Sequence, residues 1–231
     1  MTKILCIESA TTMCSAALAV DGEVLAHKEL NDGYSHAERL APFVDELLRE
    51  QDWQVADLDA IAVSKGPGSY TGLRIGVSLA KGLAFAANKP LIAVDTLEQM
   101  CLHPLVQKEL EYLKDPLLCP MLDARRMEVY AAVYDIGLMP QAETKPVILD
   151  DTSFETYLEK DAVLFFGNGS DKFKDVVHSP SAYFVADVWP DARQMAPLAQ
   201  MAFDADRFED LAYFEPNYVK PFQGTTPKPK V

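Results

Sequence analysis

Residues 65–76 read KGPGSYTGLRIG, and this stretch decides the fold. It follows an apolar run at residues 58–63 and opens an alanine-rich run that ends near Asn88, so it predicts a strand, a tight turn and a helix. The Gly-Pro-Gly sequence favours the turn, because proline fixes φ and glycine reaches conformations that are closed to other residues. Ser69 and Thr71 offer hydroxyls that could cap the helix.

The glycine spacing fits neither standard nucleotide-binding loop. A phosphate-binding P-loop requires Gly-Lys-Ser/Thr at its end, whereas Gly72 is followed by Leu73 and Arg74. The dinucleotide fingerprint Gly-x-Gly-x-x-Gly fails because its last interval is one residue too long here. Two interpretations stay open: a helix N-terminus that holds an anion through backbone N–H groups, or a helix start followed by a packing face.

Small residues continue along one side of the predicted helix at residues 71–87. They fall four apart, at Gly72, Gly76, Ala80 and Ala84. Such a face lets another backbone approach closely, so it is either buried within the domain or used by a partner. Ile75, Leu79 and Leu83, on another side, are expected to face the helix's own sheet.

Composition limits the classes of function. The 231 residues are 49% apolar and carry a formal net charge of −14, so the chain can bury a large core but repels nucleic-acid phosphates. The N-terminus shows no signal peptide, and no apolar run is long enough to span a membrane. Four scattered cysteines indicate a reducing, cytoplasmic location. The tail at residues 225–231 has the composition of a disordered segment.

The order of expected elements is strand-strand-strand-helix-strand-helix-strand-helix, which predicts an α/β fold with a mixed sheet and helices on its faces. The helices are expected at residues 36–50, 71–87 and 97–110. A second half restarts with strands at residues 117–122 and 128–134, and residues 135–159 are ambiguous. We expect two domains, residues 1–105 and 106–231, which could be a duplicated fold although no residue repeat is visible.

Candidate chemistry is sparse. The four histidines are not spaced as metal ligands, no Cys-x-x-Cys pair is present, and Ser69 does not lie in a nucleophile elbow, so we predict no metal, no cofactor and no covalent catalysis. Carboxylates follow three predicted strands, at Glu8, Asp95 and Asp123. Ligands of α/β sheets bind at the carboxyl ends of strands, so a site is expected there. Asp123 with Arg125 and Arg126 forms either a salt-bridged turn or part of such a site.

Several motifs together resemble the TsaB (YeaZ) family. The string GPGSYTGLRIG is similar to that family's hallmark, and DARRMEVY at residues 123–130 resembles its second motif. Residues 4–12 and 35–38 also resemble that family. The closing EPNYVK at residues 215–220 is similar to a weaker C-terminal signature, with Lys220 where arginine is common. The resemblance is dense over residues 1–134 and thin from there to residue 215.

The resemblance implies an actin-like fold of two α/β lobes, of the sugar kinase–Hsp70 (ASKHA) type. It also implies a cytoplasmic, non-catalytic scaffold in the bacterial complex that forms N6-threonylcarbamoyladenosine at position 37 of tRNAs. Its partners would be a TsaD-type catalytic subunit, which it activates, a TsaE-type ATPase, and a second copy bound through the same N-terminal helices. It would meet tRNA only through the complex and would not contact a membrane. The alternative is an actin-like enzyme acting alone, as an ATP-dependent kinase or a metallopeptidase-like glycoprotease.

The resemblance and the helix pattern together assign candidate residues. The partner- and self-binding face is expected at Leu40, Val44, Leu47, Gly72, Ile75, Gly76, Leu79, Ala80 and Leu83. Candidates for contacting a ligand are Glu8, Ser9, Gly66, Gly68, Ser69, Asp123 and Arg125. The first phosphate loop of actin-like kinases combines an acidic residue with a nearby glycine. The corresponding segment here, Glu8-Ser9-Ala10-Thr11, lacks that glycine, which argues against the usual nucleotide site.

Overall fold

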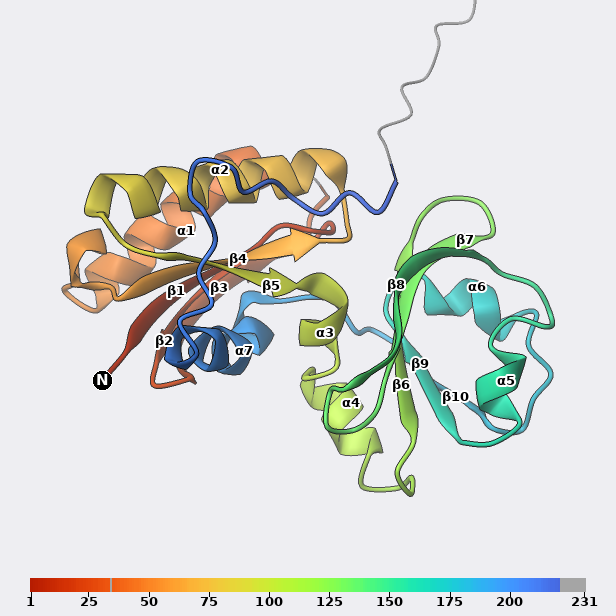
Figure 1. The fold of residues 1–231 in the computed structure, drawn as a ribbon. Helices are drawn as coiled ribbons and strands as arrows, with labels where there is room; N and C mark the ends of the chain where they lie inside the picture. Colours follow the sequence, from red (N-terminus) through yellow and green to blue (C-terminus); the bar gives the residue numbers. More distant parts are fainter. Residues whose placement is uncertain (34, 221–231) are drawn as a thin grey trace, which may run out of the picture.

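The computed structural model describes residues 1–33 and 35–220, so the tail at residues 225–231 lies outside the described part. Two five-stranded sheets form two lobes, one at each side of the view in Figure 1. The first sheet contains β1 (Lys3–Glu8), β2 (Cys14–Val20), β3 (Glu23–Leu30), β4 (Ala60–Gly66) and β5 (Leu91–Asp95). The second contains β6 (Leu117–Asp123), β7 (Glu128–Tyr134), β8 (Pro140–Ile148), β9 (Val163–Phe166) and β10 (Ala182–Val185).

The helices are α1 (His36–Glu50), α2 (Tyr70–Ala87), α3 (Thr96–Met100), α4 (Pro104–Glu109), α5 (Glu155–Leu158), α6 (Ser170–Lys174) and α7 (Ala192–Asp204), with a 3-10 turn at Val55–Asp57. The helix expected at residues 97–110 is therefore two helices. Pro104 begins the second, because its ring cannot continue a preceding helix but suits a first turn. The ambiguous region 135–159 contains β8 and α5.

The two sheets have the same topology. Strand order is β3-β2-β1-β4-β5 in the first sheet and β8-β7-β6-β9-β10, read in the same direction, in the second. In each, the second strand is antiparallel to both neighbours and the last three positions are parallel. This repeated order confirms the predicted α/β fold of actin-like, two-lobed type. The duplication is visible in the topology although the sequences of the halves do not repeat.

Helices cover both faces of the first sheet (Figure 1). Strand β1 is apolar on both sides, since Leu5 and Ile7 join a core with α1 and α2, while Ile4 and Cys6 join a core with α7. Continuous apolar runs are typical of strands that are buried on both faces. The same logic holds in the second lobe, where Phe165 stacks among the rings of a core beneath α5 and α6.

Each lobe is packed against helices that follow the strands of the other lobe in the chain. Leu97 and Met100 of α3, with Val106 of α4, pack into the core of the second sheet. In return, α7 packs on the first sheet. Residues 192–218 thus lie with the first lobe, in contrast to the expected assignment of all residues after 105 to the second.

The small-residue face of α2 lies against the molecule's own sheet. A Cβ atom on Gly72 would be 2.2 Å from the carbonyl oxygen of Ser9, and one on Gly76 would be 2.2 Å from the Ser9 hydroxyl. Ala80 and Ala84 continue this buried contact. The expectation that Ile75, Leu79 and Leu83 face the sheet is wrong, since these side chains are half-buried beside the core shared with α1.

The expected contact residues on α1 are also internal. Leu40, Val44 and Leu47 are at most 3% exposed, because the apolar stripe of α1 faces β2 and α2. With Gly72, Gly76 and Ala80 they make up most of the predicted partner-binding face, so they cannot meet a partner directly without movement of the helices. Only the flanking residues of that face remain accessible.

The four cysteines are buried and unpaired. No helix in the described part of the chain combines the length and apolar character that a membrane span requires.

Two glycines on α2 test the close approach. We expect Gly72→Ala to lower the free energy of unfolding by about 1–3 kcal/mol, because the new methyl overlaps the Ser9 carbonyl oxygen. Gly82→Ala, on the same helix, meets no atom within 4 Å and should raise it by about 0.5–1 kcal/mol. Urea unfolding of both variants measures the difference. Equal stability of the two would contradict the packing of α2.

Candidate functional site

The glycine turn closes onto the end of β1. The backbone N–H of Ser69 donates to the carbonyl of Ala10 at 2.6 Å, and a Cβ on Gly68 would lie 2.3 Å from that same oxygen. Gly66 has a φ of +102°, and a Cβ there would be 2.8 Å from the carbonyl of Asn217. The lack of side chains at these glycines thus allows neighbouring backbone segments of this chain to approach closely.

Donors at the start of α2 are used internally. The Gly72 N–H bonds to the Ser69 hydroxyl at 3.2 Å, as the capping prediction required, and the Leu73 N–H bonds to the Ser69 carbonyl at 2.9 Å. The Ser69 N–H already donates to the carbonyl of Ala10. These internal hydrogen bonds favour the interpretation as a helix start with a packing face over the interpretation as an anion-binding site.

Glu8 is the polar centre beneath this turn. Its side chain is fully buried. One carboxylate oxygen accepts from the Ala10 N–H and, at 3.1 Å, from the Ser64 hydroxyl of β4, while the other accepts from the side-chain amide of Gln99 on α3. The carboxylate therefore joins β1, β4 and the helix that passes between the lobes, and its oxygens are occupied by protein donors.

Burial raises the pKa of the Glu8 carboxyl from 4.5 to about 7, against the hydrogen bonds from Ala10, Gln99 and Ser64, which lower it. Within the described residues, the Ser9 hydroxyl and the side-chain oxygen of Gln99 have no hydrogen-bond partner. The surroundings of Glu8 thus exclude solvent, favour its protonated form, and leave two nearby polar atoms without a hydrogen-bond partner.

Asp95 forms the next polar contact along the sheet edge. It accepts from the N–H groups of Leu97 and Glu98 at 2.9 and 3.3 Å and so caps α3, and it lies 4.0 Å from the Lys65 ammonium. Burial raises the pKa of Asp95, opposed by Lys65, and burial likewise raises the pKa of Glu98. The strand-end carboxylate therefore holds the linking helix in place.

Residues 209–220, which we name the C-terminal strap, run from α7 back over α2. Lys81 donates to the carbonyls of Ala212 and Phe214 at 3.4 and 3.0 Å, and the Asn217 N–H donates to the Lys65 carbonyl at 2.6 Å. Tyr218 stacks on Tyr70 with centroids 4.7 Å apart and accepts from Arg74 Nε at 2.9 Å. The strap covers part of α2 and the end of β4.

The candidates Asp123 and Arg125 belong to the second lobe, in the β6–β7 turn. Asp123 accepts from the Arg125 N–H at 2.6 Å and from the Lys172 ammonium at 2.5 Å. No hydrogen bond or ion pair within residues 1–33 and 35–220 joins them to Glu8. The structure thus separates the seven ligand candidates into two groups, one on each lobe.

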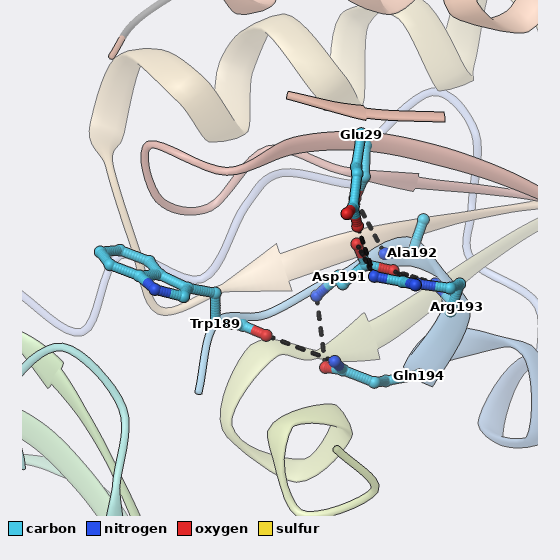
Figure 2. A network of polar contacts seen from close by, with 7 residues as sticks. Glu29, Trp189, Asp191, Ala192, Arg193 and Gln194 are labelled. Atoms are coloured by element: carbon cyan, nitrogen blue, oxygen red, sulfur yellow. Dashed lines mark hydrogen bonds and ion pairs between the residues drawn. The ribbon is translucent and has the colours of Figure 1, made fainter. Parts of the chain in front are cut away.

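A third polar network fixes the start of α7 on the first sheet. Figure 2 shows Asp191 and Arg193 meeting Glu29 of β3, with Gln194 reaching back to Trp189. Arg193 Nε donates to Asp191 at 2.8 Å, and the Ala192 N–H donates to the Ser15 hydroxyl at 2.9 Å. Burial raises the pKa of Asp191, but bonds from Arg193 outweigh it and the pKa is lowered. A hydrogen bond shared with Asp191 raises the pKa of Glu29.

The described residues contain no group of three His, Cys, Asp or Glu side chains that could hold a metal ion. A surface hollow of about 550 Å³ lies between α1 and the first turns of α2. Its lining residues are Ala37, Tyr70, Thr71, Arg74, Ile75 and Ser78.

Sequence reasoning missed several participants. Gln99 and Ser64 donate hydrogen bonds to Glu8, yet their positions within a helix and a strand give no signal of it. Lys172 comes from α6, far along the chain from Asp123. Only Tyr218 and Lys220 could have been found, since the closing EPNYVK was noticed as a weak signature.

Comparisons with known proteins agree with this architecture. The family described as TsaD, tRNA N6-adenosine threonylcarbamoyltransferase, matches residues 23–223. The chain is 32% identical over 225 residues to the Escherichia coli (strain K12) tRNA threonylcarbamoyladenosine biosynthesis protein TsaB, covering 94% of each. It is 40% identical over 120 residues to the Sphingopyxis alaskensis tRNA N6-adenosine threonylcarbamoyltransferase, covering 45% of this chain and 35% of that protein.

A solved Pseudomonas aeruginosa structure, described as a protein with similarity to peptidase YEAZ, superposes with a TM-score of 0.83 at 27% identity, covering 95% of this chain and 100% of that one. The shared fold therefore extends over both lobes.

The raised pKa of Glu8 predicts a pH-dependent stability. The folded state holds this proton more tightly than the unfolded chain, so stability falls as pH rises from about 4.5 to about 7. Glu8→Gln removes the titration, and its new amide can donate to the unpartnered oxygen of a rotated Gln99. The wild type should lose about 3 kcal/mol relative to this variant between pH 4.5 and 8.

Urea titrations of both proteins across that range measure the effect. The neighbouring Asp95 and Glu98 titrate in both proteins, so their contributions cancel. Parallel pH profiles for wild type and variant would contradict the burial of an ionisable Glu8.

Proposed function

The chain belongs to the TsaB family, and we propose that it acts in the biosynthesis of tRNA threonylcarbamoyladenosine as a non-catalytic subunit. It would pair with a TsaD-type catalytic subunit and activate it in forming N6-threonylcarbamoyladenosine at position 37 of tRNAs. The proposal that this subunit is non-catalytic rests on the buried, internally hydrogen-bonded Glu8, which we call the Glu8 centre.

Glu8 ends β1, where an actin-like enzyme would place an acidic group beside the phosphates and their metal ion. In this chain all its interactions are internal, because the Ala10 N–H, Ser64 and Gln99 donate to its two oxygens. A bound cation would have to displace these donors and open a fully buried side chain. The hydrogen bonds of Glu8 therefore suit a role in holding the lobes together better than a role in binding a substrate.

The accessible flank of α2 is our candidate for the partner-binding surface. It includes Thr71, Ser78 and the half-buried Ile75, which line the hollow beside α1. Phe85, on the last turns of the same helix, is 79% exposed. An exposed apolar side chain on the same helix as the hollow favours a protein partner. The same surface could pair two copies of this chain.

The remaining partners follow from the family resemblance. A TsaE-type ATPase would join the assembled pair, and tRNA would be held mainly by the other subunits, since this chain has a net charge of −14. A cytoplasmic location, inferred from four reduced cysteines, stays a prediction.

Reconstitution tests the proposed role. Purified TsaD-type and TsaE-type subunits with tRNA and the activated threonylcarbamoyl donor should form little modified adenosine alone, and addition of this chain should raise the initial rate at least tenfold. The chain without the TsaD-type subunit should form none. Equal rates with and without this chain would contradict the subunit role, and turnover by the chain alone would support an independent enzyme.

Ser78→Arg tests the surface. The side chain is exposed on α2, so a new charge there should leave the monomer folded but weaken pairing with the TsaD-type subunit at least tenfold, by desolvating an unpaired cation. Gly76 or Ala80 would be unsuitable positions because both face the sheet. Sedimentation of the mixture measures the affinity.

Met201→Arg provides the matched control. It adds the same charge to α7, on the opposite face of the first sheet, at a side chain that is 60% exposed. Pairing should be unaffected. If Ser78→Arg pairs as well as the control, the partner does not bind this flank.

A further inference from the structure

The β6–β7 turn, residues 123–128, presents two arginines in an unusual backbone conformation. Arg125 and Arg126 have φ values of +70° and +49°. Four residues separate β6 from β7, and the two arginines among them lie in the left-handed region, which favours Asn and Gly because larger side chains raise the energy of this conformation. Arginine at both positions costs stability, and such a cost is characteristic of residues that are kept for contact with a ligand.

The side chains of the turn and those bonded to it carry a net charge opposite to that of the whole chain, although Asp150 and Asp151 follow Leu149, whose N–H donates to the Met127 carbonyl. Lys172 bonds to Asp123, and Lys220 bonds to Glu128. The turn and its two bonded lysines thus carry four cations against two carboxylates, within a chain of net charge −14. Arg125 and Arg126 are exposed, and across residues 1–33 and 35–220 neither guanidinium group forms an ion pair with a carboxylate, although the backbone N–H of Arg125 donates to Asp123.

The cationic edge continues onto the first lobe. Lys220 ends the described strap, two residues after Tyr218, which accepts a hydrogen bond from Arg74 of α2. Figure 1 shows the end of the strap, drawn in blue, reaching across to the second lobe. Pairwise contacts therefore link Arg74 to the strap, and link Lys220 of the strap and Lys172 of α6 to the β6–β7 turn.

We propose that this edge, centred on Arg125 and Arg126, contacts the phosphate backbone of RNA in the assembled complex, an inference that rests on the proposed function. Planar guanidinium groups suit paired hydrogen bonds to phosphate oxygens. Two phosphate contacts are too few to overcome the acidity of the isolated chain, so the contact acts when another subunit already holds the RNA.

An acidic protein surface is the competing occupant. Protein interfaces have an apolar core that is surrounded by a rim of polar and charged residues, whereas Met127 is the one large apolar side chain of the turn. An exposed hairpin tip that carries two cations and little apolar surface fits a polyanion better.

Substitutions at the two arginines of the turn test the proposal. Arg125→Asn with Arg126→Gly removes both charges and restores the residues that the backbone prefers, so the variant should fold at least as stably as the wild type. Arg125→Lys with Arg126→Lys keeps the charges. Lys108→Gln with Lys160→Gln removes two exposed charges elsewhere and serves as the matched control.

Binding of tRNA to the reconstituted complex is measured over a range of salt concentrations. For the Asn-Gly variant we expect Kd to rise about tenfold and the slope of log K against log salt to fall by about 1.4–1.8, the share of two phosphates. The lysine variant should keep most of the slope, and the glutamine control should match the wild type.

Three outcomes would overturn this proposal. One is unchanged affinity and slope in the Asn-Gly variant, and another is an equal loss in the glutamine control. The third is weakened assembly of the subunits with unchanged RNA affinity, which would identify an acidic protein as the occupant. In each case modification that still requires this chain would leave the proposed function intact, whereas modification without this chain would contradict that function separately.

Discussion

The close approach of α2 to the end of β1 is the constraint on which the rest of this structure depends. Gly68 and Gly72 have no side chains, so the backbone of the turn and helix meets the carbonyls of Ala10 and Ser9 directly. This contact holds α2 against Ser9 and Ala10, which follow the buried Glu8 at the end of β1. A side chain at either glycine would separate the helix from the sheet.

Burial of Glu8 converts a strand-end carboxylate into a structural junction. Its bond to Gln99 connects the first sheet to α3, whose apolar side chains belong to the core of the second sheet. The return of α7 to the first sheet, fixed by Asp191 and Arg193, makes the exchange of helices reciprocal. The lobes are therefore joined through packed elements. This joining of the lobes supports the proposal that the molecule acts by presenting surfaces to partners.

The sequence predicted the elements better than their orientation. Apolar runs identified β1 and β4, and the glycine turn with its capping Ser69 identified the start of α2. Periodicity places Gly72 and Gly76 on one face and Ile75 on another, but it does not say which face meets the sheet. Because glycine has no side chain, the face of α2 that carries Gly72 and Gly76 approaches the sheet more closely than any other face could, and this face packs on the sheet. Leu40 and Val44 were predicted correctly as a stripe, yet a stripe that packs internally looks the same as one that binds a partner.

The candidate site was predictable only in part. Glu8 and Asp123 were found because carboxylates at strand ends are a local pattern. Their partners Gln99 and Lys172 come from distant segments that approach only through the fold, and no spacing rule connects them. The strap was also missed as an element, since residues 209–220 contain neither helix nor strand periodicity.

Calorimetric titration of the isolated chain with ATP and Mg²⁺ tests the central claim most directly, because that claim is that the Glu8 centre is closed by the chain's own donors. The account predicts no heat of binding at millimolar nucleotide, both in the wild type and in Glu8→Gln. Stoichiometric binding with a micromolar Kd, lost in Glu8→Gln, would contradict it and identify Glu8 as part of a nucleotide site.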